Sequence, residues 1–172
     1  MKKAVGKLLS GKLKVTEAMM LKSIVKGRRL PDALNEVSAI SATPGKTVSL
    51  KMSIEGEEIG ELAGDGLIAA TPTGSTAYSL AAGGPVVAPE IEAIILTPIC
   101  PSGKSLPPMV IPPGKEVWIE PTRDGRDAAV LVDGKASCKL KRGERIVIAK
   151  SERKARFYAW RDFYSSLKKK LL

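Results

Sequence analysis

The chain has 172 residues, of which 27% are charged and 44% hydrophobic, proportions typical of a one-domain globular protein. It contains no histidine, which excludes His-based triads and the usual zinc sites, and its two cysteines are too few for a disulfide framework. The net charge of +10 suits polyanionic or phosphorylated partners, but the basic residues are scattered and aromatic residues are few, so we do not expect nucleic acid as the partner.

Two features of the sequence bear on location. No apolar run approaches the ~20 residues of a membrane span. The opening Met1-Lys2-Lys3 is not followed by the apolar region of a signal peptide. We therefore expect a cytoplasmic protein without a membrane partner.

The first part of the chain is rich in strand patterns. A short helix is expected at 2–10, with its apolar residues on one face. Residues 13–25 fit either a strand or a helix from their pattern alone. A strand is expected at 33–40, another at 48–54, where apolar and polar residues alternate, and a third at 59–63.

The central stretch, residues 64–85, combines turn, strand and helix signals. Asp65-Gly66 is typical of a turn, and the apolar run 67–70 is long enough for a buried strand but too short for a helix. A hydroxyl-rich loop, 73–76, then precedes an expected short helix at 76–82, which Gly83-Gly84-Pro85 must end. Exposed N–H groups at such a helix start suit a phosphate or ribose hydroxyl, although an ordinary capped helix is an alternative. The stretch matches neither a Walker loop nor a G-x-G-x-x-G fingerprint.

Short strands dominate the remainder. They are expected at 93–97, 109–111, 116–120, 128–132, 136–140, 145–149 and 154–159, with a proline-rich connection at 98–114 and a final helix at 161–172. Many short strands with one internal helix predict a mainly β (α+β) fold, a β-sandwich with minor helices at its ends. No internal repeat or second domain boundary is evident, so we expect one domain over 1–172.

The central stretch closely resembles the signature of NAD kinases, through Asp65-Gly66-Leu67-Ile68, the run Thr71-Pro-Thr-Gly-Ser-Thr-Ala-Tyr-Ser-Leu80 and Ala82-Gly-Gly-Pro85. Further similar segments are Ala33-Leu-Asn-Glu-Val37, Leu96-Thr-Pro-Ile-Cys-Pro101 and Val132-Asp-Gly134. The resemblance implies a β-sandwich, a strand at 13–25, and phosphorylation of the adenosine ribose 2′-hydroxyl of NAD to give NADP. ATP or polyphosphate with Mg²⁺ would be the donor, and the chain would form a homo-oligomer.

The resemblance also implies a set of NAD-binding residues. These are Asn35, Glu36, Asp65, Thr76, Ala77, Tyr78, Ser79, Leu80 and Ala81. Asn35 and Glu36 would contact the dinucleotide, Thr76 and nearby N–H groups would supply polar contacts, and Asp65 would reach a neighbouring subunit's NAD. From the residues alone, the Asn-Glu pair is a surface or turn-end feature and Asp65 an ordinary turn residue.

The sequence differs from the NAD kinase pattern at several positions. In the family, a Gly-Gly-Asp-Gly loop in an N-terminal domain carries the catalytic aspartate, and this loop does not occur in the sequence. We therefore expect no catalytic residue in this chain and no activity of the chain alone. Residues 1–12 are expected to form a helical lead-in from that N-terminal domain. Ala81, Lys135 and Ala18 replace the family's serine, glutamine and arginine, and Pro107-Pro-Met-Val110 replaces Arg-Pro-Leu-Val. The alternative is a non-catalytic module that binds NAD or NADP, or oligomerises; relatedness to lipid kinases of this fold is a weaker alternative.

Overall fold

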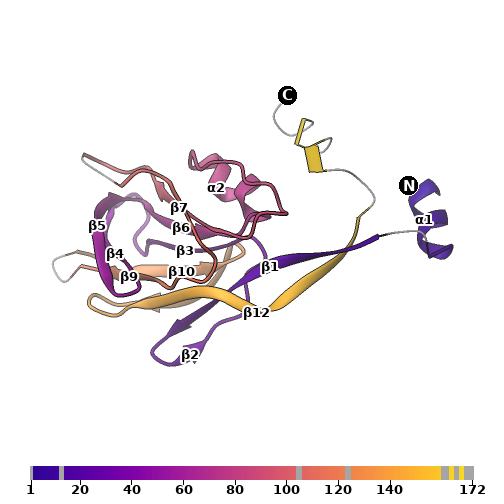
Figure 1. Cartoon of the computed structure of the whole chain (residues 1–172). Helices are drawn as coiled ribbons and strands as arrows, with labels where there is room; N and C mark the ends of the chain where they lie inside the picture. Colours follow the sequence, from indigo (N-terminus) through magenta and orange to yellow (C-terminus); the bar gives the residue numbers. More distant parts are fainter. Residues whose placement is uncertain are drawn as a thin grey trace.

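Two six-stranded antiparallel sheets form the body of the protein, shown in Figure 1 as a computed structural model. The structure describes residues 2–11, 14–103, 106–122, 125–159, 163–164 and 167–168. The expected mainly β sandwich is confirmed. The first sheet has the order β2 (Arg28–Arg29), β1 (Lys14–Val25), β12 (Ile146–Ala159), β9 (Val117–Pro121), β4 (Val48–Ile54), β5 (Glu57–Gly64). The second has the order β11 (Lys135–Leu140), β10 (Ala128–Val132), β3 (Glu36–Ser41), β6 (Gly66–Ala70), β7 (Ile94–Ile99), β8 (Met109–Ile111).

The main core lies between the two sheets. Strand β4 shows how the sequence builds it, because alternate residues Val48, Leu50 and Met52 are buried there and fill the space against the other sheet. Residues of the second sheet, such as Leu67 and Ile94, belong to the same cluster. Each fully buried side chain of this size stabilises the fold by about 1.5–3 kcal/mol relative to an exposed one.

A second, smaller core covers the outer face of the second sheet. Ile68, Ala70 and Ile95 project to this face and pack with Val87, which follows the central stretch. The 3₁₀ turn η1 (Gly74–Thr76) and the helix α2 (Tyr78–Ala81) lie over β6 and β7 there (Figure 1). Strand β6 is buried on both faces, and this explains why its sequence is a continuous apolar run rather than an alternation.

The longest ladder joins β1 and β12. It begins at the pair Lys14–Ala159 and continues to Val25–Ile146, and beyond the sandwich it reaches toward α1 (Lys2–Leu9) as a two-stranded ribbon (Figure 1). The strand at 13–25 is thereby confirmed. The expectation of two separate strands at 145–149 and 154–159 is wrong, because β12 pairs with β1 along its whole length and absorbs the interruption as a bulge opposite Met19–Leu21.

Other differences from the expected elements are small. The strand expected at 33–40 begins only at Glu36, because Leu34 and Asn35 direct their N–H groups to a side chain instead of a neighbouring strand. The two-residue strand β2 was not expected. Most of the helix expected at 161–172 falls outside the described residues; within it, 163–164 and 167–168 are helical.

Candidate functional site

Residues 34–36 are held by the carboxylate of Asp133. Its two oxygens accept the N–H groups of Leu34 at 2.9 Å, Asn35 at 2.8 Å and Glu36 at 3.2 Å. The Asp133 N–H in turn donates to the Glu36 carbonyl at 3.0 Å. Asp133 follows β10 in a left-handed conformation with φ of 47°, which aspartate tolerates better than most residues. Asp133 therefore fixes the backbone that carries Asn35 and Glu36.

The loop after β6 holds the same segment from the other side. The Thr71 N–H donates to the Asn35 carbonyl at 2.8 Å, and its hydroxyl donates to the Leu34 carbonyl at 2.6 Å. The hydroxyl also accepts the Gly74 N–H at 3.1 Å. A Cβ at Gly74 would lie 2.0 Å from the Asn35 carbonyl oxygen, so only glycine fits this approach. Asn35 is thus clamped between two loops.

Glu36 is the most unusual residue of this segment. Its side chain is buried on the outer face of the second sheet, with only 6% of the residue exposed, and its Oε2 has no hydrogen-bond partner among the described residues. Burial, and secondarily the charge of Asp133, raise the pKa of the Glu36 carboxyl. A buried acceptor without a partner is costly and rare, and a ligand that donates hydrogen bonds would satisfy it.

The helical segment differs from the helix expected at 76–82. A 3₁₀ turn ends at Thr76, and α2 begins only at Tyr78, after Ala77 departs from helical geometry. None of the hydroxyls at 73–76 caps α2, and the Thr76 hydroxyl donates to the Thr73 carbonyl at 3.4 Å. One turn of helix has almost no macrodipole, so the expectation of a ligand held by the helix N-terminus is not supported by this geometry.

The side chains of this segment divide between core and surface. Ser79 is buried, and its hydroxyl shares a 2.8 Å hydrogen bond with Thr97 of β7. Thr76, Ala77 and Leu80 are half-buried, whereas Ala81 is exposed. The hydroxyl of Ser79 is therefore occupied within the protein, and it anchors α2 to the sheet.

Tyr78 connects the remaining expected site residues. The residue is 42% exposed, and burial followed by the charges of Cys100, Asp65 and Glu36 raises the pKa of its hydroxyl. Asp65 is exposed at the start of β6, where its N–H donates to the Ile99 carbonyl at 2.9 Å. Glu36 on β3 and Asp65 before β6 are thus near enough to the Tyr78 hydroxyl to raise its pKa.

The sequence alone does not predict a role in the site for Asp133, Thr71 and Gly74. The structure shows that these residues position Asn35 and Glu36. The pair Asp133-Gly134 indicates a turn and belongs to one of the segments similar to NAD kinases, but no local pattern reveals that its carboxylate contacts a segment almost one hundred residues away. Two residues that differ from the NAD kinase pattern, Lys135 and Ala18, lie elsewhere. Lys135 is exposed at the start of β11, and Ala18 is half-buried opposite Ala155. Neither contacts the segment 34–36 in the hydrogen bonds described above.

The described residues contain neither a cluster of metal ligands nor a membrane-spanning helix. No group of three or more histidine, cysteine, aspartate or glutamate side chains there could hold a metal ion. No helix in the described part of the chain is long and apolar enough to cross a membrane.

Comparison with known proteins agrees with the architecture. Residues 34–160 match the family model described as the ATP-NAD kinase C-terminal domain. The NAD kinase of Thermococcus gammatolerans is 42% identical over 155 residues, which are 90% of this chain and 56% of that protein. The NAD kinase of Methanothermobacter thermautotrophicus is 37% identical over 166 residues, 96% of this chain and 58% of that protein.

Two solved structures are similar over 99% of the chain, each at 28% identity. Yeast NADH kinase in complex with NADH superposes with a TM-score of 0.89, and the match covers 52% of that chain. An NAD kinase from Archaeoglobus fulgidus in complex with ATP gives a TM-score of 0.84, and 65% of that chain is covered. The 172 residues thus span between about half and two thirds of the length of these relatives.

Proposed function

This chain belongs to the NAD kinase family, and we propose that it forms the dinucleotide-binding part of an enzyme that phosphorylates the adenosine ribose 2′-hydroxyl of NAD to give NADP. The observation that carries the proposal is Glu36, a buried carboxylate with an oxygen that has no partner among the described residues, on a backbone clamped by Asp133 and Thr71. Ribose hydroxyls are hydrogen-bond donors that would satisfy this oxygen.

Each expected binding residue has a role under this proposal. The carboxylate of Glu36 accepts from ribose hydroxyls, and the amide of Asn35 both donates and accepts. Thr76 supplies a hydroxyl, while Ala77, Tyr78, Leu80 and Ala81 contribute surface beside it. Ser79 acts indirectly, because its hydroxyl holds α2 against Thr97. Asp65, exposed at the start of β6, contacts the dinucleotide bound by a neighbouring subunit, which makes the assembly a homo-oligomer.

Phosphoryl transfer itself needs groups that these residues do not supply. The sequence contains no Gly-Gly-Asp-Gly loop, so the base that activates the 2′-hydroxyl would come from a residue outside it. No cluster of three acidic, cysteine or histidine ligands exists among the described residues, so they do not fit a Mg²⁺ site of their own. The donor, ATP or polyphosphate, would bring its metal on its phosphates, as is usual for Mg²⁺. We expect this chain alone to bind the dinucleotide without converting it.

The same absence of a catalytic loop favours one alternative, a module that binds NAD or NADP, or oligomerises, without chemistry. Adding a separately prepared N-terminal domain of a relative together with ATP distinguishes the two. Formation of NADP in the mixture supports the kinase, whereas binding that never leads to turnover in any such mixture supports the module.

The binding proposal is tested by calorimetric titration of this chain with NAD and NADH. We expect saturable binding that Glu36→Gln weakens on the order of tenfold, because a hydrogen bond to a charged acceptor contributes about 1.5–3 kcal/mol. The matched control is Glu90→Gln, which removes an exposed carboxylate from the loop after α2 and should leave the affinity unchanged. Absence of saturable heat with both dinucleotides, or equal affinities of Glu36→Gln and the unsubstituted chain, contradicts the proposal.

A further inference from the structure

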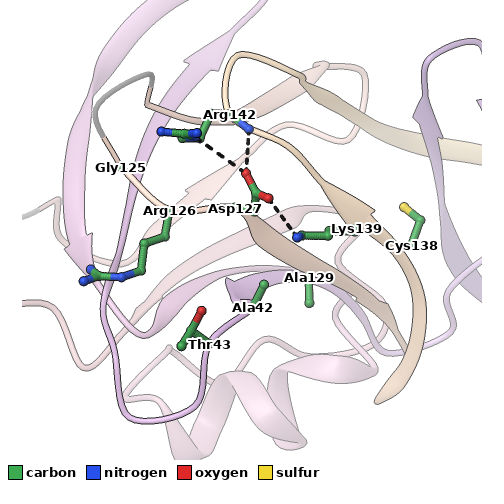
Figure 2. Close-up of a pocket in the computed structure, with 9 residues that line it drawn as sticks. All are labelled: Ala42, Thr43, Gly125, Arg126, Asp127, Ala129, Cys138, Lys139 and Arg142. Carbon is green, nitrogen blue, oxygen red and sulfur yellow. Dashed lines mark hydrogen bonds and ion pairs between the residues drawn. The ribbon is translucent and has the colours of Figure 1, made fainter.

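A depression lies near the end of β10 that is opposite Asp133. It has a volume of about 600 Å³, and its lining comes from the loop after β3, the segment before β10, β11 and the turn after β11 (Figure 2). The lining residue on β10, Ala129, lies four residues before Asp133, or roughly 13 Å along the strand. It is therefore distinct from the segment that carries Asn35 and Glu36. Its volume is in the range of small-molecule sites, about 300–1,000 Å³.

Three cationic side chains from three segments line this basic pocket. Arg126 precedes β10, Lys139 lies on β11, and Arg142 lies in the turn that follows. In the view of Figure 2 the two guanidinium groups lie on one side of Asp127 and Lys139 on the other. One carboxylate against three cations leaves the pocket with a local charge of about +2 among its described residues.

Asp127 holds two of these cations, Lys139 and Arg142, and neutralises only one charge. Its carboxylate accepts from Lys139 Nζ at 2.9 Å and from the Arg142 N–H at 3.1 Å, and the Arg142 Nε lies 3.9 Å away. The Lys139 hydrogen bond, followed by that of the Arg142 backbone, lowers the pKa of Asp127, so the carboxylate stays ionised and keeps both contacts at neutral pH.

Arg126 has spare donor capacity. Its guanidinium donates to the Thr47 carbonyl at 3.3 Å, and no carboxylate pairs with it among the described residues. A guanidinium has five N–H donors, so most of this capacity is available to a ligand. The residues between the cations, Thr43, Ala42 and Ala129, are small and leave room for one.

We propose that this basic pocket binds a small, multiply charged phosphate anion of the size of triphosphate. Guanidinium and ammonium groups carried by separate segments around one depression can donate to different phosphate oxygens of such an anion. A compact anion fits better than a nucleic acid strand, because the chain's few aromatic residues provide none to this pocket for base stacking.

The test is calorimetric titration with sodium tripolyphosphate, free of divalent metal, at low ionic strength where screening is weak. We expect saturable binding that Arg126→Gln and Lys139→Gln each weaken on the order of tenfold, as for loss of a charge-assisted hydrogen bond. The matched control is Lys115→Gln, which removes one exposed cation just before β9, whereas the pocket residues Gly125 and Arg126 follow that strand. This change should alter the affinity less than about twofold. Thermal melts of all three variants should coincide with that of the unsubstituted chain.

The proposal is overturned if binding of tripolyphosphate does not saturate, or if Lys115→Gln and Arg126→Gln weaken it equally. It is also overturned if Lys139→Gln binds as tightly as the unsubstituted chain. Binding of a short single-stranded oligonucleotide through Arg126, without binding of tripolyphosphate, would overturn it as well. NADH titration of Arg126→Gln keeps this inference separate from the proposed function. Unchanged NADH affinity supports a separate pocket, and a clear loss places Arg126 in the dinucleotide site instead.

Discussion

Replacement of Asp133 should destabilise the fold by an amount that depends on the substitute. The carboxylate accepts three backbone N–H groups, from Leu34, Asn35 and Glu36. Asp133→Ala removes all three acceptors, and at about 1 kcal/mol each the loss is roughly 3 kcal/mol. Alanine also tolerates the left-handed φ of 47° poorly, which adds at least about 1 kcal/mol.

Asp133→Asn should be much milder. An amide keeps one oxygen, which can still accept from Asn35 and Glu36, as Oδ1 does now at 2.8 and 3.2 Å. It loses the acceptor for the Leu34 N–H, and asparagine is at ease in the left-handed region. We therefore expect a loss of about 1–1.5 kcal/mol for asparagine and about 4 kcal/mol for alanine.

Urea unfolding followed by tryptophan fluorescence measures both values. Asp65→Asn and Asp65→Ala are the controls, because Asp65 is exposed and the free energy of unfolding should stay within about 0.5 kcal/mol. The reasoning is refuted if Asp133→Ala costs less than about 1 kcal/mol, or if the two Asp133 variants are equally stable.

Three further predictions concern the same region. Because the pKa of Glu36 is raised above 4.5, the folded state binds more protons than the unfolded state as the pH rises from that value, and the free energy of unfolding should fall over this window. Glu36→Gln should lack this fall and be more stable than the unsubstituted chain at neutral pH. The measurement is urea unfolding of both proteins from acidic to neutral pH, and free energies of unfolding that change in parallel with pH would contradict the prediction. Ser79→Ala should lower the free energy of unfolding in urea by about 1–3 kcal/mol, because it leaves the buried Thr97 hydroxyl unpaired. Adding Thr97→Val should recover part of this loss, whereas additive losses would show that the two hydroxyls are independent. Thr76→Val should weaken NAD binding about five- to thirty-fold in calorimetry with little change in melting temperature, and the reverse pattern would make Thr76 structural.

The strands are the part of this fold that local sequence predicts well. Alternation at Val48–Ile54 and the short runs at Met109–Ile111 and Ala128–Val132 coincide with observed strands, because side-chain burial has a period of two in a sheet. The resemblance to NAD kinases was also evident from short motifs in the printed sequence, and the family comparison confirms it. Both are local properties, and they do not require knowledge of which strands become neighbours.

Contacts between distant segments were decided only by the tertiary structure. The Asp133 carboxylate meets Leu34 and Asn35 across 98 or more residues, and this clamp delays the start of β3 to Glu36. Close packing of Gly74 on Asn35 accompanies a helix that is shorter than its sequence suggests. Hydrogen-bond acceptors and steric limits supplied by another segment outweigh local propensity here, because a buried backbone N–H must find a partner wherever the fold provides one.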